Sequence, residues 1–129
     1  MYKDFDKWNE IKKMVDIRAE KFYFHEGEIW CCSIGLNIAD ESCGKGVTFR
    51  RPVLILKKLS KTTFIGIPLS TKSKFGTWFT AVKVNNTLQC FLLYQIRMFS
   101  INRFQRRLAA LNPNELIYIK TKLRNLLSL

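Results

Sequence analysis

The sequence predicts a mainly β fold: a small antiparallel barrel with one helix before it and one after it. Three observations support this class. From residue 27 onward, five or six short apolar stretches follow one another with brief polar connections and no long helix among them. Apolar residues recur every three or four positions at both ends of the chain. Finally, 129 residues are the size of one domain. We expect a single domain with a helical extension at 1–25, the barrel at 26–111 and a helix at 112–129.

The first element is an amphipathic helix over residues 4–22. Its apolar side chains recur at helical intervals from Phe5 to Phe22, with charged residues on the other side. An apolar stripe of this kind must dock on another surface. We favour its own domain over the alternative, a second subunit.

The barrel strands are bounded by turn-forming residues. The expected strands are 27–36, 49–59, 62–70, 77–84 and 88–100. Glycines at 44 and 46 indicate a flexible loop after the first strand, and two asparagines at 85–86 indicate a tight turn. Pro52 lies near the start of the second strand, where a missing N–H is tolerated.

The last element is a helix whose start is encoded in three residues. Asn112 is a suitable N-cap, Pro113 occupies the favoured first position, and Glu115 falls at the third. An apolar stripe follows, formed by Leu116, Ile119, Leu123, Leu126 and Leu127. We expect this stripe to pack on the barrel.

The net charge of the chain indicates which kinds of molecule it binds. There are 22 Lys and Arg residues against 10 Asp and Glu residues, which gives a formal net charge of +12. A positive field of this size attracts nucleic acid or an acidic protein. No apolar run approaches the length of a membrane span, and the charged N-terminus does not read as a signal peptide. We therefore expect a cytoplasmic protein without membrane contact.

The cysteines and the histidine do not form a metal-binding pattern. Cys31, Cys32, Cys43 and Cys90 lack CxxC spacing, and His25 is the only histidine. We expect reduced thiols, no metal and no cofactor. Phosphate-binding glycine loops and hydrolase motifs are also absent from the sequence.

Polar residues at the strand ends are the candidates for chemistry. Arg50 and Arg51 open the second strand, and Ser70 and Thr71 close the third. Neighbouring antiparallel strands bring such a start and such an end together. The loop that contains Glu41 leads into the same rim, and Lys72 and Lys74 follow Thr71 directly. Arginine, hydroxyl and carboxylate together suit a phosphodiester, and RNA supplies its own nucleophile, the 2′-hydroxyl.

The two arginines are not equivalent. Adjacent residues of a strand face opposite sides, so at most one of Arg50 and Arg51 points squarely into a shared site. The spacing alone does not choose between them, and clusters of this kind are often only a solvated rim.

Five fragments in the same order resemble the MazF/PemK family of toxin endoribonucleases. They are "GEIWCCSIG", Glu41 in "ADESCGKG", "RRPVLIL", "FIGIPLSTK" and "LLYQIRMFSINRF", between Gly27 and Phe104. The resemblance identifies Arg51, directly before Pro52, as the catalytic arginine. Ser70 takes the place of the family's usual threonine.

The resemblance implies an SH3-like barrel, a homodimer and metal-independent cleavage of single-stranded RNA. The products would be a 2′,3′-cyclic phosphate and a 5′-hydroxyl. It also implies an antitoxin whose acidic tail covers the basic groove. Arg51 would clamp the phosphate, Ser70 would orient it or the 2′-hydroxyl, and Glu41 would act as general base or position Arg51. The expected RNA-binding residues are Arg50, Thr71, Lys72, Lys74, Gln95 and Arg97.

Two departures from the family pattern leave other functions open. Many members carry an acidic residue where this chain has Tyr94, and Ser70 lacks threonine's methyl group. A catalytically inactive barrel that binds nucleic acid or an acidic protein, or a gyrase-directed relative, is the main alternative, and a peptide-binding adaptor is the next. Phe75 or Trp78 could stack on a base of the RNA if either is not part of the core.

Overall fold

The computed structural model describes residues 22–34, 50–71 and 76–129. The expected helix at 4–22, apart from its last residue, lies outside this part of the chain. So does the glycine-containing loop, together with Glu41, Lys72 and Lys74.

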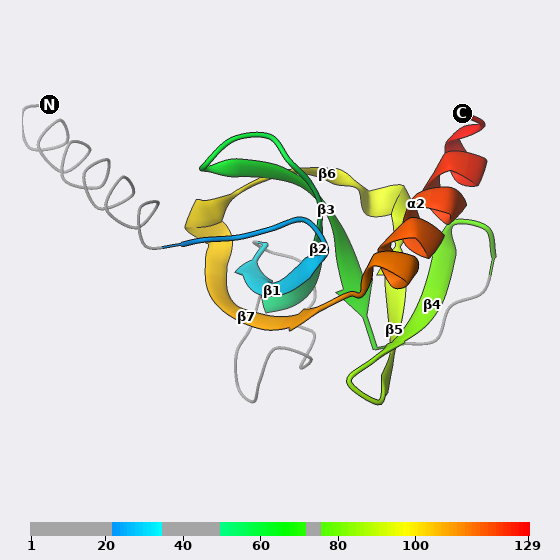
Figure 1. Cartoon of the computed structure of the whole chain (residues 1–129), viewed down its shortest axis with the longest axis horizontal. Coiled ribbons are helices and arrows are strands. Elements are labelled where there is room, and N and C mark those ends of the chain that lie inside the picture. The colour runs from blue at the N-terminus through cyan, green and yellow to red at the C-terminus, as the bar shows by residue number, and fades with distance from the viewer. Residues whose placement is uncertain (1–21, 35–49, 72–75) are drawn as a thin grey trace, which may run out of the picture.

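The described chain is mainly antiparallel sheet with a C-terminal helix, as the sequence predicts (Figure 1). The strands are β1 Glu28–Ser33, β2 Arg50–Lys58, β3 Thr63–Ser70, β4 Phe79–Val84, β5 Thr87–Leu92, β6 Arg97–Ser100 and β7 Phe104–Ala110. Short 3-10 turns η2 (Leu93–Gln95) and η3 (Ile101–Arg103) flank β6, and helix α2 spans Pro113–Leu127. The strand order is β4-β5-β3-β2-β1-β7, with β6 also paired to β3. The sheet curls as a barrel does, but the pairing path among the described strands stays open.

The expected single strand at 88–100 is wrong, because the chain breaks there into β5, η2 and β6. Both strands pair with β3, in different registers. β5 places Cys90 opposite Ser70, whereas β6 places Arg97 opposite Gly66. One regular strand cannot satisfy two registers, and the 3-10 turn takes up the difference. β7, which the sequence pattern did not predict, pairs with β1.

The turn between β4 and β5 follows from its asparagines. Asn85 and Asn86 have φ angles of 50° and 65°. A two-residue hairpin whose central residues both have positive φ matches the twist of the strands, and asparagine tolerates this conformation better than most residues.

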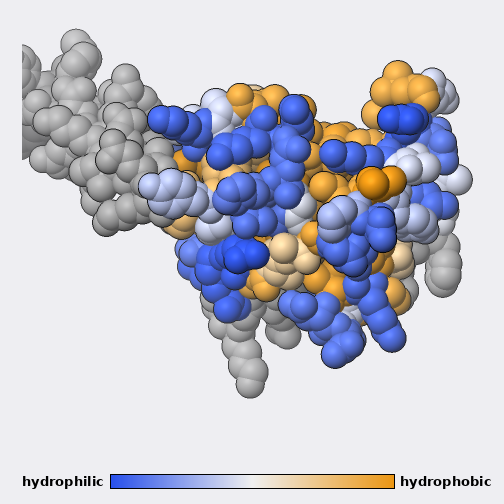
Figure 2. Space-filling view, viewed as in Figure 1, coloured by the Kyte–Doolittle hydropathy of each residue, from blue (hydrophilic) through white to orange (hydrophobic). Residues whose placement is uncertain are grey.

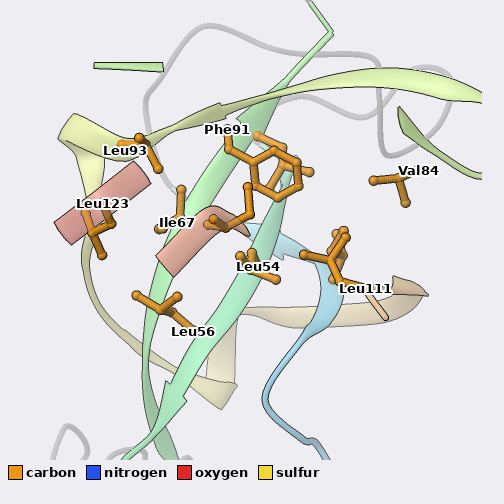
Figure 3. Close-up of a cluster of buried hydrophobic side chains, with 11 residues drawn as sticks. Leu54, Leu56, Ile67, Val84, Phe91, Leu93, Leu111 and Leu123 are labelled. Carbon is orange, nitrogen blue, oxygen red and sulfur yellow. The ribbon is translucent and has the colours of Figure 1, made fainter. Parts of the chain in front are cut away.

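The core lies on both faces of β2 and β3. Leu54, Leu56, Ile67 and Leu69 belong to one cluster, which also contains Phe91 of β5 and Leu123 of α2 (Figure 3). The opposite face packs against an aromatic cluster of Phe24, Trp30, Phe64, Phe99 and Phe104, together with Val53 and Ile55. Burial on both faces explains why the run "VLIL" is continuously apolar rather than alternating.

Helix α2 begins as the sequence predicts. The Glu115 N–H donates to Asn112 Oδ1 over 2.8 Å, and the Asn112 N–H donates to Glu115 Oε1 over 2.9 Å, so a reciprocal cap is formed. Ile119 and Leu123 are buried against the sheet. Leu127, however, is 50% exposed and does not belong to the packed stripe.

The segment before β1 is part of the core. Residues 22–25 form no helix. Phe24 is fully buried, and the Phe22 ring meets the Trp30 ring edge-on at a centroid distance of 5.6 Å. The backbone N–H of Gly27, which has φ 91°, donates to Ile55 O over 2.8 Å. The end of the expected N-terminal extension is therefore tied to the sheet.

The surface of the described part is largely hydrophilic on the viewed side, with apolar atoms near the C-terminal end of α2 (Figure 2). In the same part of the chain, no helix is long and apolar enough to span a membrane.

Candidate functional site

Arg51 and Ser70 are neighbours across β2 and β3. The two strands are antiparallel, with Val53 opposite Pro68. Two residues further along each strand, this register puts Arg51 across from Ser70. The start of β2 and the end of β3 therefore lie side by side, as predicted. β1 and β5 flank the pair, with Cys32 opposite Arg51 and Cys90 opposite Ser70.

Arg51 and Ser70 also lie on one face of the sheet. Residues opposite each other in an antiparallel pair point to the same side, as do residues two apart on one strand. Arg51 therefore shares the side of Val53, and Ser70 shares the side of Gly66. We call this side of β2, β3 and β5 the Ser70 face. The aromatic cluster fills this face from Val53 onward and includes Cys32, which lies opposite Arg51.

The guanidinium of Arg51 has an unused donor. The residue is half-buried, and its Nε is fully buried without a hydrogen-bond partner among the described residues. A buried donor without a protein partner normally costs about 1–3 kcal/mol, so it calls for an explanation, and a catalytic or ligand-binding role is one. Ser70 is 4% exposed, so its hydroxyl lies at the floor of the site.

The thiol of Cys32, which lies opposite Arg51, keeps its proton and is neutral. Burial raises its pKa far above the ordinary range, and the neighbouring Cys31 adds to this, while the positive charge of Arg103 acts in the other direction. A neutral thiol supplies no counter-charge to Arg51. Cys31, Cys32 and Cys90 are buried free thiols, as expected.

Arg50 occupies the opposite face of the sheet. It is half-buried and pairs with Ser33 of β1, one register position from Arg51. The alternation of side chains along β2 thus separates the two arginines, and only Arg51 lies on the Ser70 face. A role for Arg50 in RNA binding stays a prediction.

Arg97 joins the Ser70 face from β6. It lies opposite Gly66, four residues before Ser70 on β3, and its guanidinium carbon is 4.6 Å from the centroid of the Phe99 ring. Gln95 ends η2, where its Nε2 donates to Tyr94 Oη over 2.9 Å. These two predicted RNA contacts are therefore farther along the sheet than Arg51 and Ser70, near the middle of β3.

The remaining predicted site residues lie in or beside the undescribed segments. Thr71 directly follows β3 and is exposed. Glu41, Lys72 and Lys74 lie outside the described residues, so their positions relative to Arg51 remain a prediction.

The carboxylates of the described part lie away from Arg51 and Ser70: they are at the far end of β2, at the start of β1 and at the start of α2. Glu26 and Glu28 lie beside the start of β1, where they contact the Lys58 N–H at 2.9 Å and Arg107 Nε at 3.2 Å. Glu115 caps α2. Strands β2 to β6 carry no acidic residue, so the arginines on the Ser70 face are not neutralised by these strands. The described residues also include no group of three or more metal-ligating side chains.

Two exposed aromatic residues stand out near this site. Trp78 precedes β4 and is 58% exposed, and Tyr94 in η2 is 45% exposed. The sequence allowed Trp78 to be either core or surface, and its exposure settles this. The sequence singles out Tyr94 only as the replacement of an acidic residue, because no local signal marks the break between β5 and β6.

Comparison with known protein families decides the family. The model of the PemK-like, MazF-like toxins of type II toxin–antitoxin systems matches residues 25–127, which include every described strand and α2. The chain belongs to this toxin family. No curated protein sequence matches it.

Solved toxin structures share the fold of this chain. An endoribonuclease in complex with its cognate antitoxin, from mycobacterial species, has a TM-score of 0.65 at 15% identity, covering 83% of this chain and 97% of that one. The Mycobacterium tuberculosis toxin MazF-mt6 has a TM-score of 0.61 at 15% identity, with coverages of 79% and 97%. MazF from Deinococcus radiodurans has a TM-score of 0.59 at 16% identity, with coverages of 84% and 99%. At these identities the similarity establishes the toxin fold.

Proposed function

We propose that this toxin is an endoribonuclease that cleaves single-stranded RNA at the Arg51–Ser70 pair. The observation that carries the proposal is the buried, unpartnered Nε of Arg51 across from the Ser70 hydroxyl, on the same face of the sheet. Membership of the MazF-like toxins and the endoribonuclease of similar fold give further support.

The proposed reaction is an internal transesterification. The 2′-hydroxyl of one nucleotide attacks the adjacent phosphorus, and the bond from phosphorus to the 5′-oxygen of the next nucleotide breaks. The 2′-hydroxyl proton goes to a general base, for which Glu41 is the candidate, and the departing 5′-oxygen gains a proton. The fragments then carry a 2′,3′-cyclic phosphate and a 5′-hydroxyl, and the step needs no metal.

Arg51 and Ser70 would interact with the phosphate, on which negative charge develops during this reaction. Negative charge grows on the phosphoryl oxygens as the new bond forms. A guanidinium with a free, desolvated donor stabilises that charge, and a fixed donor of this kind needs no reorganisation during the reaction. The Ser70 hydroxyl would orient the phosphate or the attacking 2′-hydroxyl from the floor of the site.

Other residues, most of them cationic, would hold the RNA and the antitoxin. Arg97 lies on the same face as Arg51, and Thr71, Lys72 and Lys74 follow Ser70 in the chain. An acidic antitoxin segment would compete for this charge, and a homodimer in the cytoplasm is the expected form of the free toxin.

Cleavage in the presence of EDTA tests the proposal. A mixed-sequence RNA would be incubated with wild type, Ser70→Ala and Ser70→Thr, and the product ends would be identified by mass spectrometry. We expect cleavage by wild type to 2′,3′-cyclic phosphates, at least a tenfold loss in Ser70→Ala, and substantial activity in Ser70→Thr, which keeps the hydroxyl.

The outcomes separate the possible functions. Equal rates for wild type and Ser70→Ala would remove Ser70 from the mechanism. Loss of wild-type activity in EDTA would refute the metal-free reaction. RNA binding without any cleavage would support the inactive barrel, which the replacement of an acidic residue by Tyr94 keeps open.

A further inference from the structure

Trp78 and Tyr94 form an exposed aromatic pair. Their ring centroids are 5.9 Å apart and the ring planes are inclined by 44°. The residues are 58% and 45% exposed, although aromatic rings of this size normally contribute to the core. Both rings therefore keep much of their surface available to a ligand.

The pair is held in place by its neighbours. The half-buried Phe79 ring meets Tyr94 edge-on at a centroid distance of 5.2 Å and an angle of 79°. Gln95 Nε2 donates to Tyr94 Oη over 2.9 Å, which restrains the other end of the ring. A restrained ring loses little conformational freedom when it binds a ligand, so its contacts contribute more fully to affinity.

The pair also adjoins the Ser70 face. Phe79 pairs with Leu92 of β5, two residues beyond Cys90, which pairs with Ser70. Phe79 and Ser70 therefore point to the same side of the sheet. Two strand spacings and two residues along a strand put their backbones roughly 12 Å apart. Tyr94 packs on Phe79 and so belongs to this side as well.

We propose that Trp78 and Tyr94 are a base-stacking platform for a nucleotide of the RNA that lies on the Ser70 face. Arg51 and Arg97 on this face attract the phosphates of a polyanion, and a base offers a flat apolar surface to the rings beside them. The substrate class rests on the proposed function. The platform extends the proposed function, because it explains how the protein holds a base next to the cleaved bond.

The test uses ligands that cannot be cleaved. The affinity of a labelled, mixed-sequence 2′-O-methyl RNA would be measured by fluorescence anisotropy for wild type, Trp78→Leu, Tyr94→Leu and Trp78→Phe. Stacking on an aromatic ring is worth about 1–3 kcal/mol per base, so we expect each leucine variant to bind about fivefold to 150-fold more weakly. Trp78→Phe should recover most of the affinity.

An abasic phosphodiester of the same length is the matched ligand, and Tyr23→Leu is the matched variant. Tyr23 is 81% exposed and lies before β1, away from the platform. We expect the abasic ligand to bind wild type and Trp78→Leu equally, and Tyr23→Leu to bind the RNA as wild type does.

Two results would overturn the platform. One is an equal loss of affinity for RNA and abasic ligand, which would assign the residues a structural or electrostatic role. The other is an unchanged affinity of Trp78→Leu for RNA. If the oligomeric state of this variant changes while its RNA affinity does not, the Trp78 ring belongs to a protein contact. These assays measure binding alone. A failure of the wild type to cleave RNA would refute the proposed enzyme, and the binding assays would still decide whether the platform holds a base.

Discussion

Replacement of Arg51 by alanine should separate activity from stability. Removal of one fixed donor to a developing negative charge typically costs about 10²–10³-fold in rate, or about 3–4 kcal/mol. The effect on folding should be small, because two contributions oppose each other. The substitution removes two methylene groups of packing, at about 0.8 kcal/mol each. It also removes the penalty of the buried, unpartnered Nε, about 1–3 kcal/mol.

The expected result is a loss of at least 100-fold in cleavage with a change of no more than about 1.5 kcal/mol in the free energy of unfolding. Initial rates on a mixed-sequence RNA would be compared with urea denaturation of the same preparations. Arg106→Ala is the matched control, because it removes one exposed arginine charge from β7. Its rate should stay within a few-fold of wild type.

Two results would refute this reasoning. Cleavage by Arg51→Ala within tenfold of wild type would show that the guanidinium does not stabilise the reaction. A loss of stability of several kcal/mol would show that Arg51 has a structural partner, and that its role is to hold the sheet together.

Three further predictions follow from the described residues. Gly66→Ala should lower stability by about 1–3 kcal/mol, because a Cβ there would lie 2.7 Å from Val53 Cγ1 and 2.8 Å from Phe64 Cε2. Thermal unfolding followed by circular dichroism measures this change. An unchanged midpoint would contradict the tight β2–β3 packing. The raised pKa of Cys32 means that the folded state keeps a proton that the unfolded state loses above about pH 8.5, so stability should fall as pH rises beyond that value. Urea titrations from pH 8 to 10 should show a smaller fall in Cys32→Val, and an identical fall would exclude this thiol as the cause. Arg97→Ala should reduce the slope of log K against log salt for RNA binding by about 0.7, the value for one phosphate contact on a single strand, and an unchanged slope would remove Arg97 from the RNA path.

The sequence predicted most elements because their signals are local. Asn112, Pro113 and Glu115 define the start of α2 through contacts within one turn. Asn85 and Asn86 define the β4–β5 hairpin through their own backbone preferences. The family fragments selected Arg51 over Arg50, and the alternation of β2 separates the same two residues onto opposite faces.

The misses all depend on contacts between distant segments. The break between β5 and β6 arises because the two strands pair with different parts of β3 in different registers, which no local pattern records. β7 becomes a strand because β1 offers it an edge, although its own sequence carries two arginines in the middle. Leu127 has helical spacing but is 50% exposed, whereas its neighbour Leu126 packs against the core.

The sequence by itself determined the family, the strand-rich class, the helix cap and the identity of the candidate arginine and hydroxyl, because each is encoded in a few adjacent residues or in their order. Only the tertiary structure decided that Arg51 faces Ser70 with a buried free donor, and that Trp78 and Tyr94 are exposed beside them. Register and burial are set by which strands meet, and strands far apart in the sequence meet only when the whole sheet has formed.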